Sequence, residues 1–291
     1  KKNNTKLLLS RTLPANSGFT GITENAGEVE SKGIETELTS VNINTKSGFK
    51  WSTSFNIAFV KNKLLSLNAG ATRIGNSYIV GEPLNVLWTY RYAGVNPADG
   101  RAMYYDKNNN ITYQPVTADQ TKIGDSNPNF YGGFINTFSY KGLTLDVMFQ
   151  YQYGNHAYIQ TQQVVEAAGS GYDNQVRRSL TDRWTTPGQI TDIPRSYDTY
   201  IEPGSSSSDI MSSRFIQKAS YIRLKQVTLN YKLPTKFTSK IGIPSISVFA
   251  QGVNLLTFTN YRGEDPENVG ANNLNGYPNS RTITGGLTVQ F

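Results

Sequence analysis

Hydrophobic and polar residues alternate along several long segments of the chain. In segment 143–153, apolar or aromatic side chains occupy every second position, and polar side chains occupy most of the positions between them. Segment 130–140 shows the same alternation, and the dipeptide Lys141-Gly142 joins the two. A period of two is typical of a strand with one apolar and one polar face, and a glycine-containing two-residue link is typical of a hairpin turn. The pattern therefore predicts one long hairpin here.

The same alternation recurs along the rest of the sequence. It changes parity inside segment 214–233, which predicts a β-bulge near Lys225. About eight strands are expected, near residues 3–12, 30–44, 48–61, 130–141, 143–154, 214–233, 243–257 and 281–291.

These predicted strands are long, and the links between them differ greatly in length. Several strands reach the ~9–11 residues that a tilted strand needs to cross a bilayer, against roughly 5–6 residues in an ordinary globular strand. Short links alternate with long ones, as in outer-membrane barrels with brief periplasmic turns and extended extracellular loops. We therefore predict an all-β fold, an antiparallel transmembrane β-barrel segment with long extracellular loops.

Aromatic residues near the strand ends are consistent with this fold. Tyr and Trp are enriched where a membrane protein crosses the two membrane–water interfaces. The predicted membrane girdle consists of Trp51, Tyr140, Tyr151, Tyr153, Tyr231 and Phe291.

Two alternatives remain open at this point. A soluble β-sandwich or barrel gives the same alternation, with its apolar face buried in a core. Eight strands are also enough to close a small barrel with a filled interior. Because the loops make up so much of the chain, we expect instead an arc of a larger barrel.

Composition narrows the classes of protein. No apolar run approaches the ~20 residues of a membrane-spanning helix. The sequence has no cysteine and a single histidine, His156, which excludes a disulfide framework and a Cys/His zinc site. Basic residues exceed acidic ones by 28 to 21, but they are scattered. This charge indicates solubility and contact with the membrane rim, and a nucleic-acid partner is not expected.

Five motifs, spread in order over nearly the whole chain, resemble the C-terminal half of SusC/RagA-type TonB-dependent transporters of the Bacteroidota outer membrane. They precede a last strand that ends in an aromatic residue. The motifs are EVESKGIE at 28–35, WTTPGQITDIPR at 184–195, YIRLKQVTLNYKLP at 221–234, NLLTFTNYRGEDPE at 254–267 and YPNSR at 277–281.

The resemblance implies a 22-stranded barrel with an N-terminal plug, a SusD-like surface lipoprotein as partner, and import of glycans or peptides energised through TonB. Residues 1–291 would then be the C-terminal portion of the barrel, without the plug and without the segment that contacts TonB. The terminal Phe291 resembles the signal that barrel-insertion machinery recognises. The expected function is nutrient import in the outer membrane, without enzymatic activity; a soluble or surface-attached carbohydrate-binding module is the alternative.

Few residues form a motif for catalysis or metal binding. His156 is followed by Ser170 and Asp173, but a catalytic triad is defined by geometry that this spacing does not specify. The run from Asp106 to Thr112 resembles the start of a calcium loop but lacks its glycine, so an Asn-rich turn is favoured. The acidic run 264–267 is interpreted as a solvated loop tip. No cofactor and no metal site are therefore expected.

The long links are rich in aromatic residues. Flat rings with polar edges are suited to sugars and peptides, and the alternative is that they pack the loops together. The predicted contacts with a substrate or a lid protein are Trp88, Tyr90, Tyr92, Trp184, Tyr200, Tyr261 and Asp265.

Overall fold

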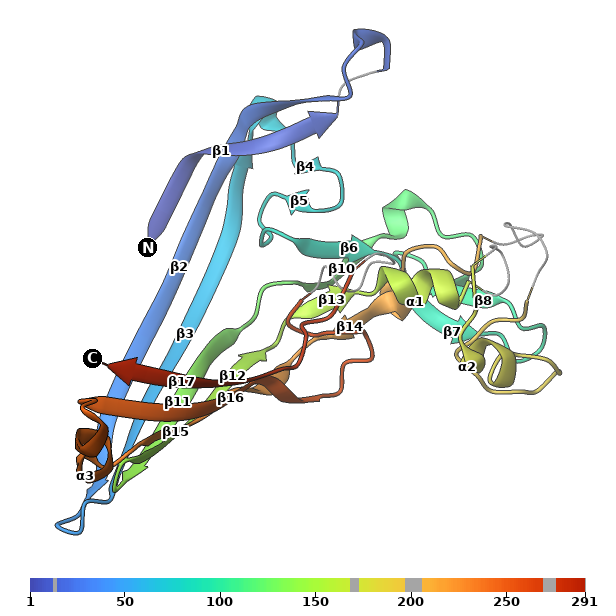
Figure 1. Cartoon of the computed structure of the whole chain (residues 1–291). Coiled ribbons are helices and arrows are strands. Elements are labelled where there is room, and N and C mark those ends of the chain that lie inside the picture. The colour runs from blue at the N-terminus through green and yellow to red at the C-terminus, as the bar shows by residue number, and fades with distance from the viewer. Residues whose placement is uncertain (13–14, 168–172, 197–205, 269–275, 291) are drawn as a thin grey trace.

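The computed structural model describes residues 1–12, 15–167, 173–196, 206–268 and 276–290, and it is built around one curved antiparallel sheet (Figure 1). The sheet has eight strands in the order β1-β2-β3-β11-β12-β15-β16-β17. Their bounds are β1 Lys2–Thr12, β2 Gly21–Asn44, β3 Lys50–Leu67, β11 Phe130–Tyr140, β12 Leu143–Tyr153, β15 Tyr221–Lys232, β16 Ser245–Thr259 and β17 Thr282–Gln290.

Shorter elements lie in the links between these strands. The short strands are β4 Arg73–Ile74, β5 Tyr78–Ile79, β6 Val86–Thr89, β7 Arg91–Val95, β8 Ala102–Tyr105, β9 Ile111–Thr112, β10 Thr121–Asp125, β13 His156–Tyr158 and β14 Ile216–Lys218. The helices are α1 Gln160–Val165, α2 Arg177–Thr181 and α3 Thr235–Thr238, with 3-10 turns η1 Ala15–Ser17, η2 Asn68–Gly70, η3 Thr117–Asp119, η4 Ser213–Phe215 and η5 Ser239–Ile241. In the described part of the chain, no helix is both long and apolar enough to span a membrane.

The predicted all-β fold and its eight strands are confirmed, with two differences in their bounds. The β2–β3 hairpin is longer than predicted, because β2 begins at Gly21 and β3 continues to Leu67. Its outer part carries a small core of its own, in which Val29 and Leu64 are buried against the β4–β5 hairpin. This extension lies in a segment where the alternation is interrupted, so the pattern alone ended the strands too early.

The second difference is in the predicted strand 214–233, which is divided into β14 and β15. The predicted bulge is confirmed. Lys225 has no partner in the ladder with β12, where Gln226 pairs with Met148 and Leu224 pairs with Phe149. The register with β16 shifts at the same place. The extra residue restores the apolar side chains of β15 to one face of the sheet.

The register of the ladders keeps the two faces of the sheet chemically distinct. One row of directly paired residues crosses six strands and contains only Leu and Phe, and its two central rings stack at a centroid distance of 4.9 Å. Because side chains alternate between faces, a slip of one residue would exchange the apolar and polar faces. The row consists of Leu38, Phe55, Phe134, Phe149, Leu224 and Leu256.

The apolar face is exposed, and the opposite face is polar. Leu38 is 61% exposed and Leu287 is 63% exposed, although both belong to the apolar face. On the polar face, the Thr137 hydroxyl donates to Asp146 at 2.5 Å. A soluble β-sandwich would bury its apolar face in a core, so this exposure disfavours the soluble alternative.

All the short turns lie at one end of the sheet, and the long links gather at the other (Figure 1). The β2–β3 turn, the Lys141-Gly142 turn and the β15–β16 link with α3 are at the first end, called here the short-turn end. The two outer strands, β1 and β17, each pair on one side only among the described residues. The sheet is therefore an open arc, as the sequence predicted.

A glycine on the apolar face lets a tyrosine reach across the sheet. Tyr151 pairs with Gly132 on the neighbouring strand, and its hydroxyl donates to the Asn56 carbonyl two strands away at 2.9 Å. A Cβ atom at Gly132 would collide with that carbonyl oxygen and lie 2.7 Å from the Tyr151 hydroxyl. The ring thus covers the missing side chain, a recognised way of supporting a glycine in a sheet.

We predict that Gly132→Ala destabilises the sheet by about 1–3 kcal/mol, because the added methyl group must displace Tyr151 or the backbone of β3. Gly285→Ala is the matched control. Gly285 lies in β17 on the same apolar face of the sheet as Gly132, and a Cβ atom added to it would meet nothing closer than 3.7 Å. Thermal or urea unfolding of the full-length protein checks the difference. Equal stability of the two variants would contradict the role of Gly132.

Candidate functional site

The long links are tied together into one layer at the end of the sheet opposite the short turns (Figure 1). The Thr89 hydroxyl, in the β3–β11 link, donates to the Met211 carbonyl in the β12–β15 link at 2.6 Å. Ser213 makes two hydrogen bonds with segment 90–92: its hydroxyl accepts from the Tyr92 backbone N–H, and its own N–H donates to the Tyr90 carbonyl, both at 2.9 Å. These bonds join segments about 120 residues apart in the sequence, so the layer is a folded unit.

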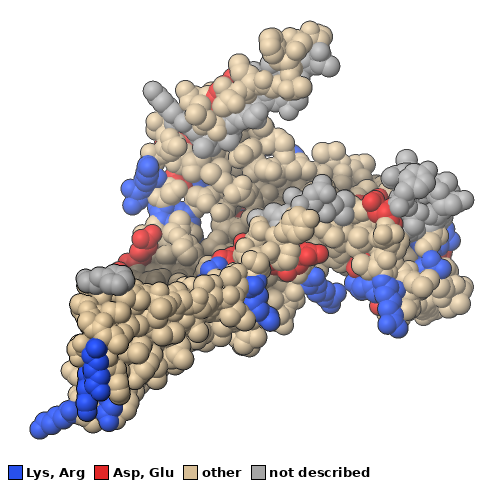
Figure 2. Space-filling view, viewed as in Figure 1, with Lys and Arg blue, Asp and Glu red and all other residues tan. Residues whose placement is uncertain are grey.

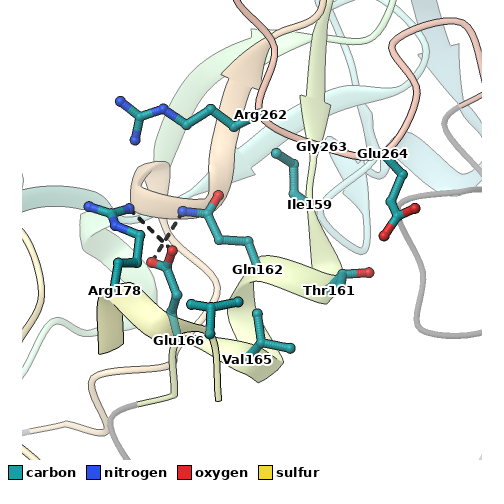
Figure 3. Close-up of a pocket in the computed structure, with 10 residues that line it drawn as sticks. Ile159, Thr161, Gln162, Val165, Glu166, Arg178, Arg262, Gly263 and Glu264 are labelled. Atoms are coloured by element: carbon teal, nitrogen blue, oxygen red, sulfur yellow. Dashed lines mark hydrogen bonds and ion pairs between the residues drawn. The ribbon is translucent and has the colours of Figure 1, made fainter. Parts of the chain in front are cut away.

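A pocket of about 610 Å³ opens in this layer (Figure 3). It lies between α1, α2 and the start of the β16–β17 link. Ile159, Val165 and Val176 give it an apolar wall, while the other lining side chains are polar or charged. Pockets with an apolar lining and a few placed polar groups are the usual form of a ligand site. This pocket is therefore the candidate functional site.

Buried ion pairs hold the wall of the pocket in place. Glu166 is buried and lies 3.2 Å from Arg178 and 3.4 Å from Arg214. Arg178 also donates to both carboxylate oxygens of Asp192 at 2.8 Å. Burial alone would raise the pKa of Asp192, but the hydrogen bond and the positive charge of Arg178 together outweigh burial and lower the pKa below the ordinary value.

Two charged side chains at the pocket remain without an ion pair among the described residues. Arg262 and Glu264 flank Gly263, and both are exposed (Figure 3). They carry opposite charges, so the mouth of the pocket offers one cation and one anion to a ligand. Exposed charges give up less hydration on binding than buried ones and mainly provide specificity.

An ion-pair cluster centred on Arg223 fixes the β16–β17 link to the polar face of β15. The Arg223 guanidinium lies 2.6 Å from Asp265 and 2.5 Å from Glu267. Lys225, the bulged residue, pairs with Glu267 at 2.6 Å. Arg223 is 3% exposed and Asp265 is 2% exposed. Breaking a buried pair leaves an uncompensated charge and costs about 3–5 kcal/mol, so this cluster clamps the base of the link.

The interpretation of residues 264–267 as a solvated loop tip is wrong for Asp265. Its carboxylate also accepts backbone N–H groups of Glu267 and Asn279, each at 2.9 Å. Burial alone would raise the pKa of Asp265, but the Arg223 hydrogen bond and these N–H groups lower it below the ordinary value. Long-range pairing with Arg223, 42 residues away, is what removed this carboxylate from solvent.

The predicted aromatic contacts mostly join loop segments to one another. The Tyr92 hydroxyl donates to the Asp192 carbonyl at 3.1 Å, and the Trp184 indole donates to the Pro97 carbonyl at 2.9 Å. Tyr261 is buried in a cluster with Ile159, and burial raises the pKa of its phenol.

Trp88 and Tyr90 are partly buried, and Tyr200 lies outside the described residues. None of the described members of the set lines the pocket, and their contact with a ligand or lid stays a prediction.

The described members of the predicted girdle lie on the apolar face, with Trp51, Tyr140 and Tyr231 near the short-turn end and Tyr151 and Tyr153 near the long links. The Trp51 indole donates to the Asn136 side-chain oxygen at 3.0 Å, so a polar partner accompanies it on this face. Phe291 lies outside the described residues. Contact of these rings with a membrane interface stays a prediction.

The described residues of the two weaker motifs occupy structural positions. Asp106 accepts the backbone N–H groups of Asn108 and Asn110 at 2.8 Å each, as in the favoured Asn-rich turn. His156 is half-buried opposite Lys218, and burial lowers its pKa. Ser170 lies outside the described residues. In the described part of the chain, no three His, Asp or Glu side chains are grouped to hold a metal ion.

Sequence reasoning missed the charged residues that organise this region. The ion pairs of Arg223 and the ion pair of Glu166 with Arg178 join residues that are not neighbours in the sequence, so no local residue spacing predicts these ion pairs. The one usable signal was the change of parity around residue 225, which marks a place where β15 departs from regular pairing.

We predict that Asp265→Asn loosens the β16–β17 link, because Arg223 then loses a charged partner in a buried position. Amide hydrogen exchange in residues 260–268 of the full-length protein should become faster, and the Glu264→Gln variant, altered at an exposed neighbour, is the control. Since the Asp265 pKa is lowered from its ordinary 3.8, the stabilisation is present above that pH and is lost as the pH falls through the folded value.

In the wild type, protection should therefore stay constant from about pH 8 to pH 5 and decrease in stronger acid. Asp265→Asn should show little of this acid-dependent change. Wild-type protection in the Asp265→Asn variant at neutral pH would contradict the clamp.

Comparison with known proteins relates the whole chain to one class of receptor. It is 33% identical over 325 aligned positions to TonB-dependent receptor P3 of Formosa agariphila, covering 98% of this chain and 31% of that protein. It is 24% identical over 310 positions to TonB-dependent receptor SusC of Bacteroides thetaiotaomicron, covering 98% of this chain and 29% of SusC. The chain thus spans about a third of the length of the curated relatives it matches.

Solved structures give the same result. The RagAB peptide transporter superposes with a TM-score of 0.84 at 26% identity, over 99% of this chain and 32% of that one. The RagAB peptide importer in its "open-open" state gives a TM-score of 0.81 at 27% identity over the same shares. The scan of protein-family models finds no match.

The sheet described above therefore matches part of the RagA barrel. TonB-dependent receptors are transporters that sit in the outer membrane, and they are not enzymes. On its sequence relatives and its fold together, this chain belongs to the SusC/RagA type of TonB-dependent receptors and corresponds to about a third of a full receptor.

Proposed function

We propose that the protein containing this chain imports a peptide or an oligosaccharide across the outer membrane, in a TonB-dependent manner and together with a SusD-like surface lipoprotein. The observation that carries this proposal is the two-faced sheet, with its tied loop layer, superposing on the RagAB peptide transporter over 99% of the chain. This chain would be the C-terminal portion of the barrel.

The chemistry of the two faces suggests their surroundings. The exposed apolar face would meet lipid tails, and the polar face, with Asp146 and Gln150, would line a water-filled lumen. The short-turn end would then face the periplasm and the loop layer the outside. Trp51, Tyr140, Tyr231, Tyr151 and Tyr153 would form the two interfacial girdles.

Ligand capture would take place at the loop pocket. Its apolar wall and its exposed Arg262 and Glu264 suit a peptide, which combines apolar side chains with groups of both charges. The buried ion pairs of Glu166 and the Arg223 cluster keep the pocket walls in a fixed arrangement before ligand arrives. Such preorganisation reduces the cost of binding. The lipoprotein partner would close over this layer, and TonB would act through the rest of the receptor.

An oligosaccharide is the second candidate ligand, favoured by the aromatic rings of the loops. Trp88 lies in β6, Tyr92 in β7 and Tyr90 between the two strands, where rings of the assembled receptor would stack on sugar faces. The soluble carbohydrate-binding module is disfavoured, because a module free in water would not expose so much of one apolar sheet face.

The proposed function is tested by uptake in cells that carry the full-length receptor. Labelled peptide mixtures and labelled oligosaccharide mixtures are supplied separately, and one of the two classes should be imported only when the receptor is present. Collapse of the proton gradient or loss of TonB should abolish this import.

We predict that Arg262→Glu weakens binding of the imported ligand about tenfold, the value of one charge-assisted hydrogen bond. Lys107→Glu, an exposed charge in another loop, is the control.

Import that survives loss of TonB would refute the energy coupling. Equal ligand affinity of the Arg262→Glu and Lys107→Glu receptors would mean that the ligand does not bind at the pocket. Uptake of neither class of ligand would refute nutrient import.

A further inference from the structure

Lysines gather at the short-turn end of the sheet, although the sequence shows no basic run. They come from three separate turns, which the hairpins bring to the same end (Figure 1). Figure 2 shows Lys and Arg side chains at this lower left tip of the molecule, with no acidic side chain on the visible tip. This lysine collar consists of Lys46, Lys50, Lys141, Lys232, Lys236 and Lys240.

The collar accounts for most of the net charge of the chain. Its six lysines make up six of the seven positive charges by which basic residues exceed acidic ones. The segments that build this end, 39–53, 140–145 and 229–249, contain no Asp or Glu. All six side chains belong to exposed residues, and none has an ion pair among the described residues. A positive field this localised attracts an anionic partner.

Apolar side chains lie among these charges. In the α3–η5 segment, Phe237 is 59% exposed and Ile241 is 64% exposed, four residues apart and each next to a lysine. Tyr140 at the same end is exposed, and the Lys141 ammonium lies 5.0 Å from its ring centroid. A short helical segment with Lys beside Phe and Ile is the composition of an interfacial anchor, which lies in the headgroup layer with its apolar side chains in the acyl region.

We propose that the short-turn end of this receptor binds anionic phospholipid headgroups of the inner leaflet of the outer membrane. The lysine collar contacts the phosphates, and Phe237 and Ile241 insert among the acyl chains. This inference rests on the proposed membrane placement of the sheet. Lipid is favoured over a soluble acidic polymer, since such a polymer offers nothing to the exposed Phe and Ile side chains.

The test uses the full-length receptor in phosphatidylcholine vesicles that contain either spin-labelled phosphatidylglycerol or spin-labelled phosphatidylcholine. The wild-type receptor should immobilise the anionic lipid preferentially, and 0.5 M salt should reduce this preference. Lys236→Gln/Lys240→Gln should lower the preference about fivefold or more, as expected for basic residues near an anionic surface. Lys61→Gln/Lys63→Gln, two exposed lysines near the other end of β3, is the charge-matched control and should keep the wild-type preference.

A second variant, Phe237→Ser/Ile241→Ser, keeps every charge and should also lower the preference. The absence of a preference in the wild type, an equal loss in the control, or an unchanged preference after Phe237→Ser/Ile241→Ser would each overturn the proposal. The last result would mean that the collar binds anionic headgroups by charge alone, without insertion of Phe237 and Ile241 among the acyl chains. Ligand uptake is measured separately, so a receptor that keeps its lipid preference but imports nothing would refute the proposed function and leave this inference intact.

Discussion

The cross-strand register of the eight-strand sheet is the constraint on which the other features depend. A single row of Leu and Phe side chains crosses six strands, and on the same face the next row toward the long links is also largely apolar. Because side chains alternate, this register also assigns Asp146, Gln150 and Arg223 to the opposite face. The bulge at Lys225 is part of the same constraint, since it keeps the apolar side chains on both sides of it in β15 on one face of the sheet.

The polar face in turn provides the attachment for the loops. Arg223 stands on this face, where it meets Asp265 and Glu267 from the β16–β17 link. The bulged Lys225 reaches the same Glu267. A device that corrects the strand register therefore also supplies a cation for the loop clamp. The loop layer is thus joined to the sheet by charge and joined internally by hydrogen bonds between links.

The two ends of the sheet carry different chemistry. At the loop end, charges of both signs are paired within the protein, and Arg262 and Glu264 remain available at the pocket. At the short-turn end, the charges are all positive and lie beside exposed Phe237 and Ile241. An asymmetry of this kind suits a receptor whose one end captures solutes and whose other end rests at a membrane surface.

The sequence by itself determined the strands, the bulge and the family. A period-two pattern is local, so the alternation in 130–154 is enough to predict the β11–β12 hairpin with its turn at Lys141. Tertiary structure decided the rest, because it depends on residues far apart in the sequence. The burial of Asp265 against Arg223, the pairing of Glu166 with Arg178 and Arg214, and the meeting of lysines from three turns each require strands to be placed side by side first. The local alternation predicts which face of the sheet a side chain occupies. Which oppositely charged side chain it pairs with depends on how the strands are placed in the assembled sheet.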